Sequence, residues 1–343
     1  MGTFLIAALI ILELVMRYFS LICKPLLAAL LLLSQLTPQA LAQKEKAEEK
    51  NEFEVVEHYR VIWIDAEVIS RSKGSVVTDL RHQDFIISEN NVRQVVIAWQ
   101  RLPVPLSLLI VVDAAPNYTD SVSLDDRVNA LKSSLAPFLK PEDEVSIMAL
   151  TEGPLLLQNY TSNKDLIRKT LDEALRYKET PHLSVEKRFR IAIHEAAKQA
   201  ERSHNPEARR ATILISDLPA RAANEVVLPE WVIRTVLDSG SIFCWSRSSR
   251  LPSRSSDPAK VSFNRVSVND LVGVTGGEYL GSDWKSFLER LRERFRIAYL
   301  PNTFGRSGDV VRIGLELKPS ANRDTNDLVL SYPRFAIIPF SKR

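Results

Sequence analysis

Cysteine is scarce in this 343-residue chain, which carries only Cys23 and Cys244. Cys23 lies in an apolar N-terminal stretch, so a chain that has lost this stretch retains Cys244 alone and can form no intrachain disulfide. The chain also lacks a P-loop, a G-x-G-x-x-G fingerprint and a G-x-S-x-G elbow. The usual signatures of NTPases, dinucleotide-binding enzymes and α/β-hydrolases are therefore missing.

A large excess of charge of either sign is also missing. The formal net charge is +3, from 45 basic and 42 acidic residues. Such a balance gives no electrostatic reason to expect a nucleic-acid partner. The 45% hydrophobic content is sufficient for a buried core, and the length suggests about two domains.

The N-terminus has the pattern of an export signal. A basic segment, 16–24, precedes an apolar run, 25–36, and the sequence Ala40-Leu41-Ala42 then offers a cleavage site before Gln43. We interpret residues 1–42 as a signal peptide region in which Met16 is the true start. The protein is then periplasmic or extracellular, without a lasting membrane span. The alternative is an uncleaved anchor, although the apolar runs 3–15 and 25–36 are both shorter than the ~20 residues of a spanning helix.

The rest of the chain changes its pattern three times. Residues 43–54 form a charged linker, 55–102 contain short β-type runs, 103–304 alternate between strands and helices, and 305–341 return to β-type runs. Alternation predicts an α/β domain with a doubly wound, mostly parallel sheet. We expect the two β segments to combine into one small, discontinuous β-sandwich into which this domain is inserted. Alternatively, the C-terminal strands pack only against the α/β sheet. The strand candidates of the α/β sheet are 106–112, 144–150, 210–216, 240–246, 277–280 and 295–300.

Aspartates follow two strands of the predicted parallel sheet, Asp113 after 106–112 and Asp217 after a later strand. The carboxyl ends of such strands are where open α/β sheets bind ligands. In the order of its elements the chain resembles the von Willebrand factor A-type domain, and 55–339 is similar to exported bacterial proteins described as VWFA-related. The matching segments are Val76 to Leu80, Asp84 to Glu89, Pro105 to Ser107, Arg210 to Asp217, Leu271 to Gly277 and Phe295 to Tyr299.

The resemblance implies a metal-ion-dependent adhesion site. In that family the first strand ends in Asp-x-Ser-x-Ser, and a threonine and a second aspartate come from two other loops. Together they hold an ion such as Mg²⁺, which binds an acidic group of the partner. Asp113 and Asp217 match the aspartates, but Ala115 and Asn117 replace the serines, and the basic pair Lys187-Arg188 lies near the expected threonine.

These departures imply a degenerate site. Ala115 has no ligand atom, and a basic pair repels a cation. We therefore expect binding at Asp113, Ala115, Asn117 and Asp217 without a cofactor. The alternative is a surviving Mg²⁺ site formed by Asp113, Asn117 and Asp217.

The resulting hypothesis is an exported, non-enzymatic module of the adhesion type. It binds a protein partner in the cell envelope or outside the cell, at the carboxyl end of its parallel sheet. A second alternative is a hydrolase in the same cleft, which requires a histidine such as His182 or His194 within hydrogen-bonding reach of Ser216.

Overall fold

The computed structural model describes residues 61–339 except 102, 116–123, 179, 248–260, 302–305 and 320–323. The predicted signal region and linker lie outside these residues. The described residues all belong to one compact unit, Arg60–Arg343. None of the helices in the described residues combines the length and the apolar character that crossing a membrane requires.

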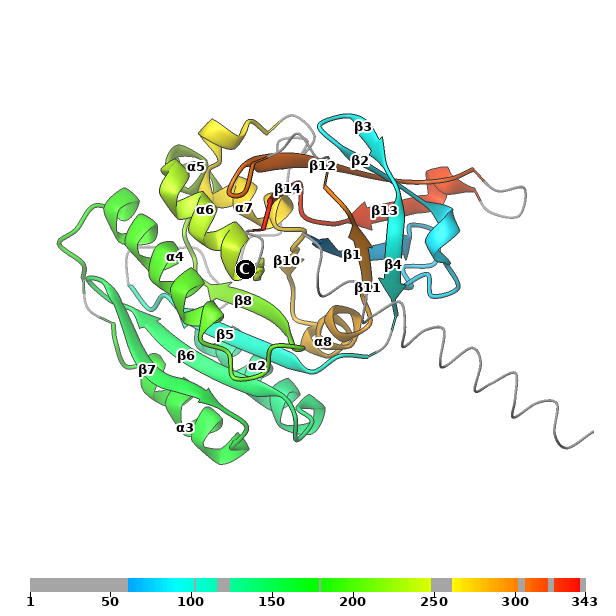
Figure 1. Ribbon diagram of the computed structural model, residues 1–343. Coiled ribbons are helices and arrows are strands. Elements are labelled where there is room, and N and C mark those ends of the chain that lie inside the picture. Colours follow the sequence, from blue (N-terminus) through cyan, green and yellow to red (C-terminus); the bar gives the residue numbers. More distant parts are fainter. Residues whose placement is uncertain are drawn as a thin grey trace, which may run out of the picture. The chain divides into compact units, whose positions relative to one another are not determined.

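A six-stranded sheet forms the centre of the α/β domain (Figure 1). Its spatial order is β10-β9-β8-β5-β6-β7, and all neighbours are parallel except β7, which runs antiparallel to β6. All seven residues of β5 are buried, as expected for a strand that helices cover on both faces. The expected doubly wound, mostly parallel sheet is therefore confirmed. The strands are β5 (Leu106–Val112), β6 (Glu144–Leu150), β7 (Pro154–Thr161), β8 (Arg209–Ile215), β9 (Ile242–Ser246) and β10 (Tyr279–Leu280).

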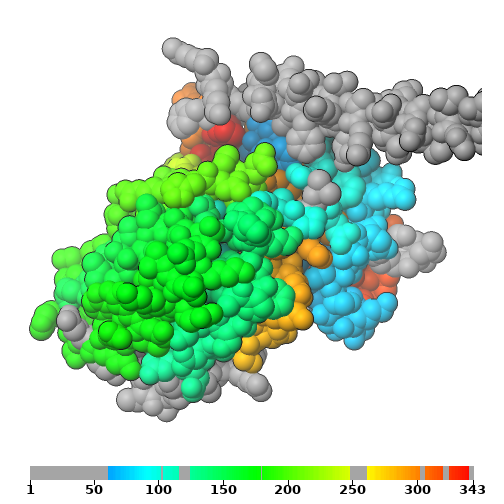
Figure 2. Space-filling view, turned by 90° about the horizontal axis from the view of Figure 1, so that it is seen from below, coloured from blue at the N-terminus to red at the C-terminus, as the bar shows by residue number. Residues whose placement is uncertain are grey.

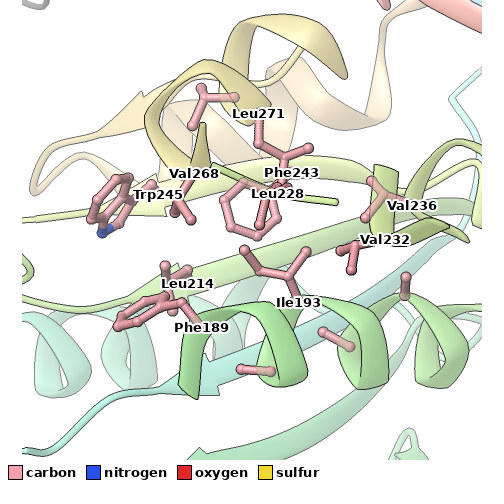
Figure 3. Packing of buried hydrophobic residues seen from close by; sticks show 14 of the residues in the cluster. Phe189, Ile193, Leu214, Leu228, Val232, Val236, Phe243, Trp245, Val268 and Leu271 are labelled. Carbon is pink, nitrogen blue, oxygen red and sulfur yellow. The ribbon is translucent and has the colours of Figure 1, made fainter. Parts of the chain in front are cut away.

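Helices pack on both faces of this sheet because successive strand residues point to opposite sides. In β5, Leu109 and Val111 belong to the core under α4, α6 and α7, whereas Leu108 and Ile110 belong to the core under α2, α3 and α8. Figure 3 shows the first core, in which Phe189 of α4 lies against Leu214 of β8. The helices are α2 (Leu124–Phe138), α3 (Lys164–Ala174), α4 (Val185–Glu201), α5 (Ala220–Glu225), α6 (Glu230–Ser239), α7 (Val268–Val274) and α8 (Trp284–Arg292).

Two antiparallel four-stranded sheets form the β-sandwich. One has the order β13-β1-β11-β4 and the other β14-β12-β2-β3. A shared core, which includes Ile64, Ile87, Ile297 and Ile313, lies between them. The N-terminal and C-terminal β segments therefore combine, as expected. The elements are β1 (Ile62–Ser70), β2 (Phe85–Glu89), β3 (Val92–Gln94), β4 (Val96–Gln100), β11 (Phe295–Tyr299), β12 (Val310–Leu317), β13 (Leu328–Ser331) and β14 (Phe335–Ile337), with 3-10 turns η1 (His82–Asp84), η3 (Phe263–Arg265) and η4 (Thr325–Asp327).

Two strands differ from the expectation. The strand predicted at 295–300 for the parallel sheet is β11, which pairs with β1 and β4 in the sandwich, so the predicted domain range 103–304 includes a sandwich strand. Its alternate residues Phe295, Ile297 and Tyr299 enter the sandwich core, and Arg296 is the cross-strand partner of Asp65. The other difference is β7, an edge strand that the sequence analysis did not predict.

Arginines join the α/β domain to the sandwich. Arg209 of β8 donates to Asp65 of β1 over 3.0 Å and to the carbonyls of Leu291, Arg292 and Arg294 at 2.6 to 3.0 Å. Arg290 of α8 donates to Glu67 of β1. In Figure 2, α8 (orange) accordingly lies between the green surface of the α/β domain and the blue surface of the N-terminal strands. The two parts are thus connected by charge-assisted hydrogen bonds as well as by the chain.

Candidate functional site

The carboxyl ends of β5 and β8 lie side by side at the point where the strand order reverses. The chain first extends the sheet from β5 to β6 and β7, and later continues on the other side of β5 with β8. Such a switch point is where open α/β sheets bind ligands. We use the name carboxyl edge for the residues that follow β5, β6 and β8 and for those at the start of α4. They are Asp113–Ala115, Thr151–Gly153, Ser216–Pro219 and Ser184–Arg188.

Asp113 is buried at this edge, with 2% of its surface exposed. Arg188 Nη2 lies 3.0 Å from its Oδ1, and Ser216 Oγ donates to its Oδ2 over 2.6 Å. Both carboxylate oxygens are therefore engaged by the chain itself. Burial raises the pKa of Asp113 above its ordinary value, while the Arg188 charge and the Ser216 hydroxyl act in the opposite direction.

Asp217 has a second arginine partner. Arg127 of α2 places Nη2 2.5 Å from Asp217 Oδ1, and its Nη1 donates to the Ser246 carbonyl over 2.7 Å. Only 8% of Arg127 is exposed. Burial lowers the pKa of this guanidinium, and Asp217 partly offsets that effect. Arg127 thus ties α2 to the ends of both β8 and β9.

The helix that supplies Arg188 is held at the same edge. Ser184 caps α4 by accepting from the Lys187 backbone N–H. Glu152, in the turn between β6 and β7, accepts 2.6 Å hydrogen bonds from the backbone N–H groups of His182 and Leu183. A carboxylate that binds two backbone donors fixes the approach of the chain to the helix. Arg188 is consequently directed into the interior, where 1% of it is exposed.

The donor set does not fit a Mg²⁺ ion. Such an ion requires near-octahedral oxygen ligands, and Asp113 and Asp217 each have a guanidinium group where a cation would bind. Ala115 is buried and offers no ligand atom. Within the described residues, no group of three or more His, Cys, Asp or Glu side chains is placed to hold a metal.

Three of the four predicted binding residues therefore lie at the carboxyl edge. Ser216 donates a hydrogen bond to Asp113, and Asp217 is the next residue in the sequence, so the two aspartates lie close together. Asn117 lies outside the described residues.

The two arginines were not predicted from the sequence as partners of the aspartates. A signal exists in the helical period, because Arg188 is one turn before buried Ala192 and Arg127 one turn before buried Leu131. An arginine on the apolar side of a helix requires a buried acceptor. The helical period therefore puts both arginines on the apolar sides of their helices. It does not indicate which carboxylate each arginine binds.

Within the part of the chain that the structure describes, no histidine forms a hydrogen bond with Ser216. It is fully buried, and its Oγ donates to Asp113 and accepts from the Leu218 N–H. Among the described hydrogen bonds, neither His182 nor His194 reaches it. The His194 ring instead packs on Trp231, at a centroid distance of 4.6 Å. This arrangement does not favour the hydrolase alternative.

No family model matches the sequence, and no curated protein matches it. Solved structures match at low similarity. An aerotolerance-related membrane protein from Bacteroides fragilis, carrying multiple mutations to serine, is 14% identical over 54% of this chain and 96% of its own, with a TM-score of 0.36. The manganese-loaded TRAP protein of Plasmodium vivax is 11% identical over 73% and 98%, with a TM-score of 0.37. The vWF domain of the pilus tip protein Mfa5 from Porphyromonas gingivalis is 13% identical over 34% and 38%, with a TM-score of 0.25.

At these identities and scores the comparisons carry no argument about what the chain binds. The evidence for the fold is the topology itself. A mostly parallel sheet carries helices on both faces, and aspartates follow β5 and β8, as the sequence resemblance implies. On this topology, the chain carries an α/β domain of the von Willebrand A-type fold.

Proposed function

We propose that this chain is an exported, non-enzymatic interaction module that binds a partner protein at its carboxyl edge without a metal ion. The observation that carries the proposal is that both aspartates of the expected cation site already hold buried guanidinium groups. Partner recognition then depends on the shape and polarity of the edge. The N-terminal signal pattern supports export.

The edge has the features that protein recognition requires. Loops from several elements converge there. The Glu152 carboxylate accepts hydrogen bonds from the backbone before α4, and the Ser184 hydroxyl accepts one from the first turn of α4. Exposed side chains lie on this edge and directly after it: Lys187 belongs to the edge, and Arg221 follows Pro219 in α5. Preformed loops lose little entropy on binding, and a standard interface needs about 800 Å² from each partner. A protein partner that covers the edge makes contacts of ordinary surface complementarity.

Site-specific crosslinking tests the position of the interface. The chain from Gln43 onward, with a photoreactive residue at 187 or 221, is incubated with cell-envelope extract, and crosslinked proteins are identified. We expect one partner at both positions. The control position is Lys140, an exposed residue at the opposite, amino end of the sheet. A partner crosslinked equally well from position 140 would contradict the proposal.

The purified partner then permits a test of affinity. We expect the double charge reversal Lys187→Glu and Arg221→Glu to weaken binding about tenfold or more. A partner surface that complements two basic side chains repels two acidic ones. Lys140→Glu should leave the affinity unchanged. We also expect EDTA and MnCl₂ to have no effect. Loss of binding in EDTA would support the alternative Mg²⁺ site.

A further inference from the structure

The two arginines at the carboxyl edge come from opposite faces of the central sheet. Arg188 belongs to α4, whose core lies on one face, and Arg127 belongs to α2, whose core lies on the other. Each meets one of the aspartates that follow β5 and β8. Two independent helices therefore deliver a cation to the same small region.

We propose that Arg188 and Arg127 are internal cations that replace a metal ion in holding the carboxyl edge together. They are positioning residues, and a substitution that removes Arg188 should restore the ability of the edge to bind a metal ion. This inference concerns the construction of the edge, so it does not depend on the partner in the proposed function.

The connections made by the guanidinium groups support this role. Arg188 binds Asp113 and so connects α4 to β5, and Ser216 extends the connection to β8 through the same carboxylate. Arg127 connects α2 to Asp217 after β8 and to the Ser246 carbonyl of β9. A coordinated ion would join strand ends in the same manner, through oxygen atoms of several loops.

The charge balance also supports it. The Asp113 carboxylate and the Arg188 guanidinium group have no net charge together, so Arg188 supplies the positive charge beside Asp113 that a bound cation would otherwise supply. Burial makes this balance necessary, because an unpaired charge in the interior is strongly unfavourable. The exposed fractions of Asp113 and Arg188 are only 2% and 1%. A chain that lost Arg188 would therefore need another cation beside Asp113.

Removing the guanidinium group should create a cation site. In the double variant Arg188→Thr/Ala115→Ser, the guanidinium group beside Asp113 is removed and two hydroxyl oxygens are added at the carboxyl edge. We expect this variant to bind Mn²⁺ in calorimetry and to gain about 5 °C in Tm at an ion concentration of about 100 times Kd. The unmodified chain should show neither heat nor a Tm shift with Mn²⁺.

Two variants serve as controls. Arg188→Lys keeps a buried cation beside Asp113, so it should not respond to Mn²⁺. Arg190 lies on the same helix, and its ion pair with Glu186 is at the surface. The variant Arg190→Thr should therefore not respond to Mn²⁺ either. If the double variant does not fold without the ion, its refolding yield with and without Mn²⁺ is compared.

The possible outcomes separate cleanly. Refolding only with Mn²⁺ would support the inference. It would be overturned by a double variant that ignores Mn²⁺, or that refolds under neither condition. It would also be overturned by saturable Mn²⁺ binding to the unmodified chain that Asp113→Ala abolishes. No partner protein is present, so this test and the crosslinking test of the proposed function can fail separately.

Discussion

Replacing Arg209 by methionine should strongly destabilise the protein. The arginine is 1% exposed and binds the Asp65 carboxylate and three backbone carbonyls. Methionine fills a similar space without donating a hydrogen bond, and removing one partner of a buried ion pair costs about 3–5 kcal/mol. At about 2 °C for each kcal/mol in a domain of this size, Tm should fall by about 6–10 °C.

Urea unfolding followed by tryptophan fluorescence measures this change as a lower midpoint. The matched control is Arg210→Met, because Arg210 is the next residue of β8 and is only half-buried, with one 3.2 Å hydrogen bond to the Ser239 carbonyl. We expect that control to cost about 1 kcal/mol. Equal costs for the two substitutions would refute the assignment of Arg209 as the junction between the sheets.

The pH dependence of the unfolding free energy gives a second measure of the ion pair between Arg209 and Asp65. Burial acts to raise the pKa of Asp65, but Arg209 and Arg296 outweigh it and hold that pKa well below its ordinary range. A lowered folded-state pKa stabilises the protein above the unfolded value of about 3.9, and this contribution is lost as the pH falls through the folded value. Below about pH 4 the difference between wild type and Arg209→Met should therefore shrink. A difference that grows on acidification would contradict this account.

Three smaller changes test other contacts. Ser216→Ala should lower the free energy of unfolding by about 1.5–3 kcal/mol in urea titrations, since its hydroxyl donates to the Asp113 carboxylate; an unchanged midpoint would contradict that bond. Cys244 is fully buried, and burial raises the pKa of its thiol to about 12. It should therefore react with a thiol reagent at pH 8 only after denaturation, and labelling of the native protein would show the strand to be accessible. Gly277→Ala places a Cβ 1.9 Å from the Phe243 carbonyl oxygen, so Tm should fall by at least about 2–6 °C for a cost of 1–3 kcal/mol; an unchanged Tm would mean that the backbone moves freely there.

The apolar pattern was sufficient to predict the central sheet and the place of its aspartates. Seven residues with a single polar member, Leu106–Val112, are typical of a strand buried on both faces, and the carboxylate that follows must lie at the sheet edge. The edge strand β7 gave no such signal. It begins at Pro154 and exposes two successive leucines, Leu155 and Leu156, so it has neither a continuous apolar run nor a clean alternation.

The sheet to which a strand belongs was harder to predict than the strand itself. Residues 295–299 have a β-type pattern that fits either sheet, and the cross-strand pair of Arg296 with Asp65 decides for the sandwich. The candidate site had the same difficulty. Charge and position indicated that Lys187-Arg188 is unfavourable for a metal, but the direct bond from Arg188 to Asp113 depends on how α4 packs across β5. Pairings between distant segments are set by packing, which a local pattern does not encode.

The position of β11 beside β4 has a consequence for the order of folding. The chain leaves the sandwich after Gln100 and returns at Phe295, and Gln100 is paired with the next residue, Arg296, across adjacent strands. Closing a loop of about 200 residues before the insertion folds is entropically unfavourable and slow. We therefore expect pulse-labelling hydrogen exchange to protect β5 and β6 before β1; simultaneous protection would contradict this order. Once the α/β domain has formed, it brings its own two ends together, and this long-range contact becomes a local one.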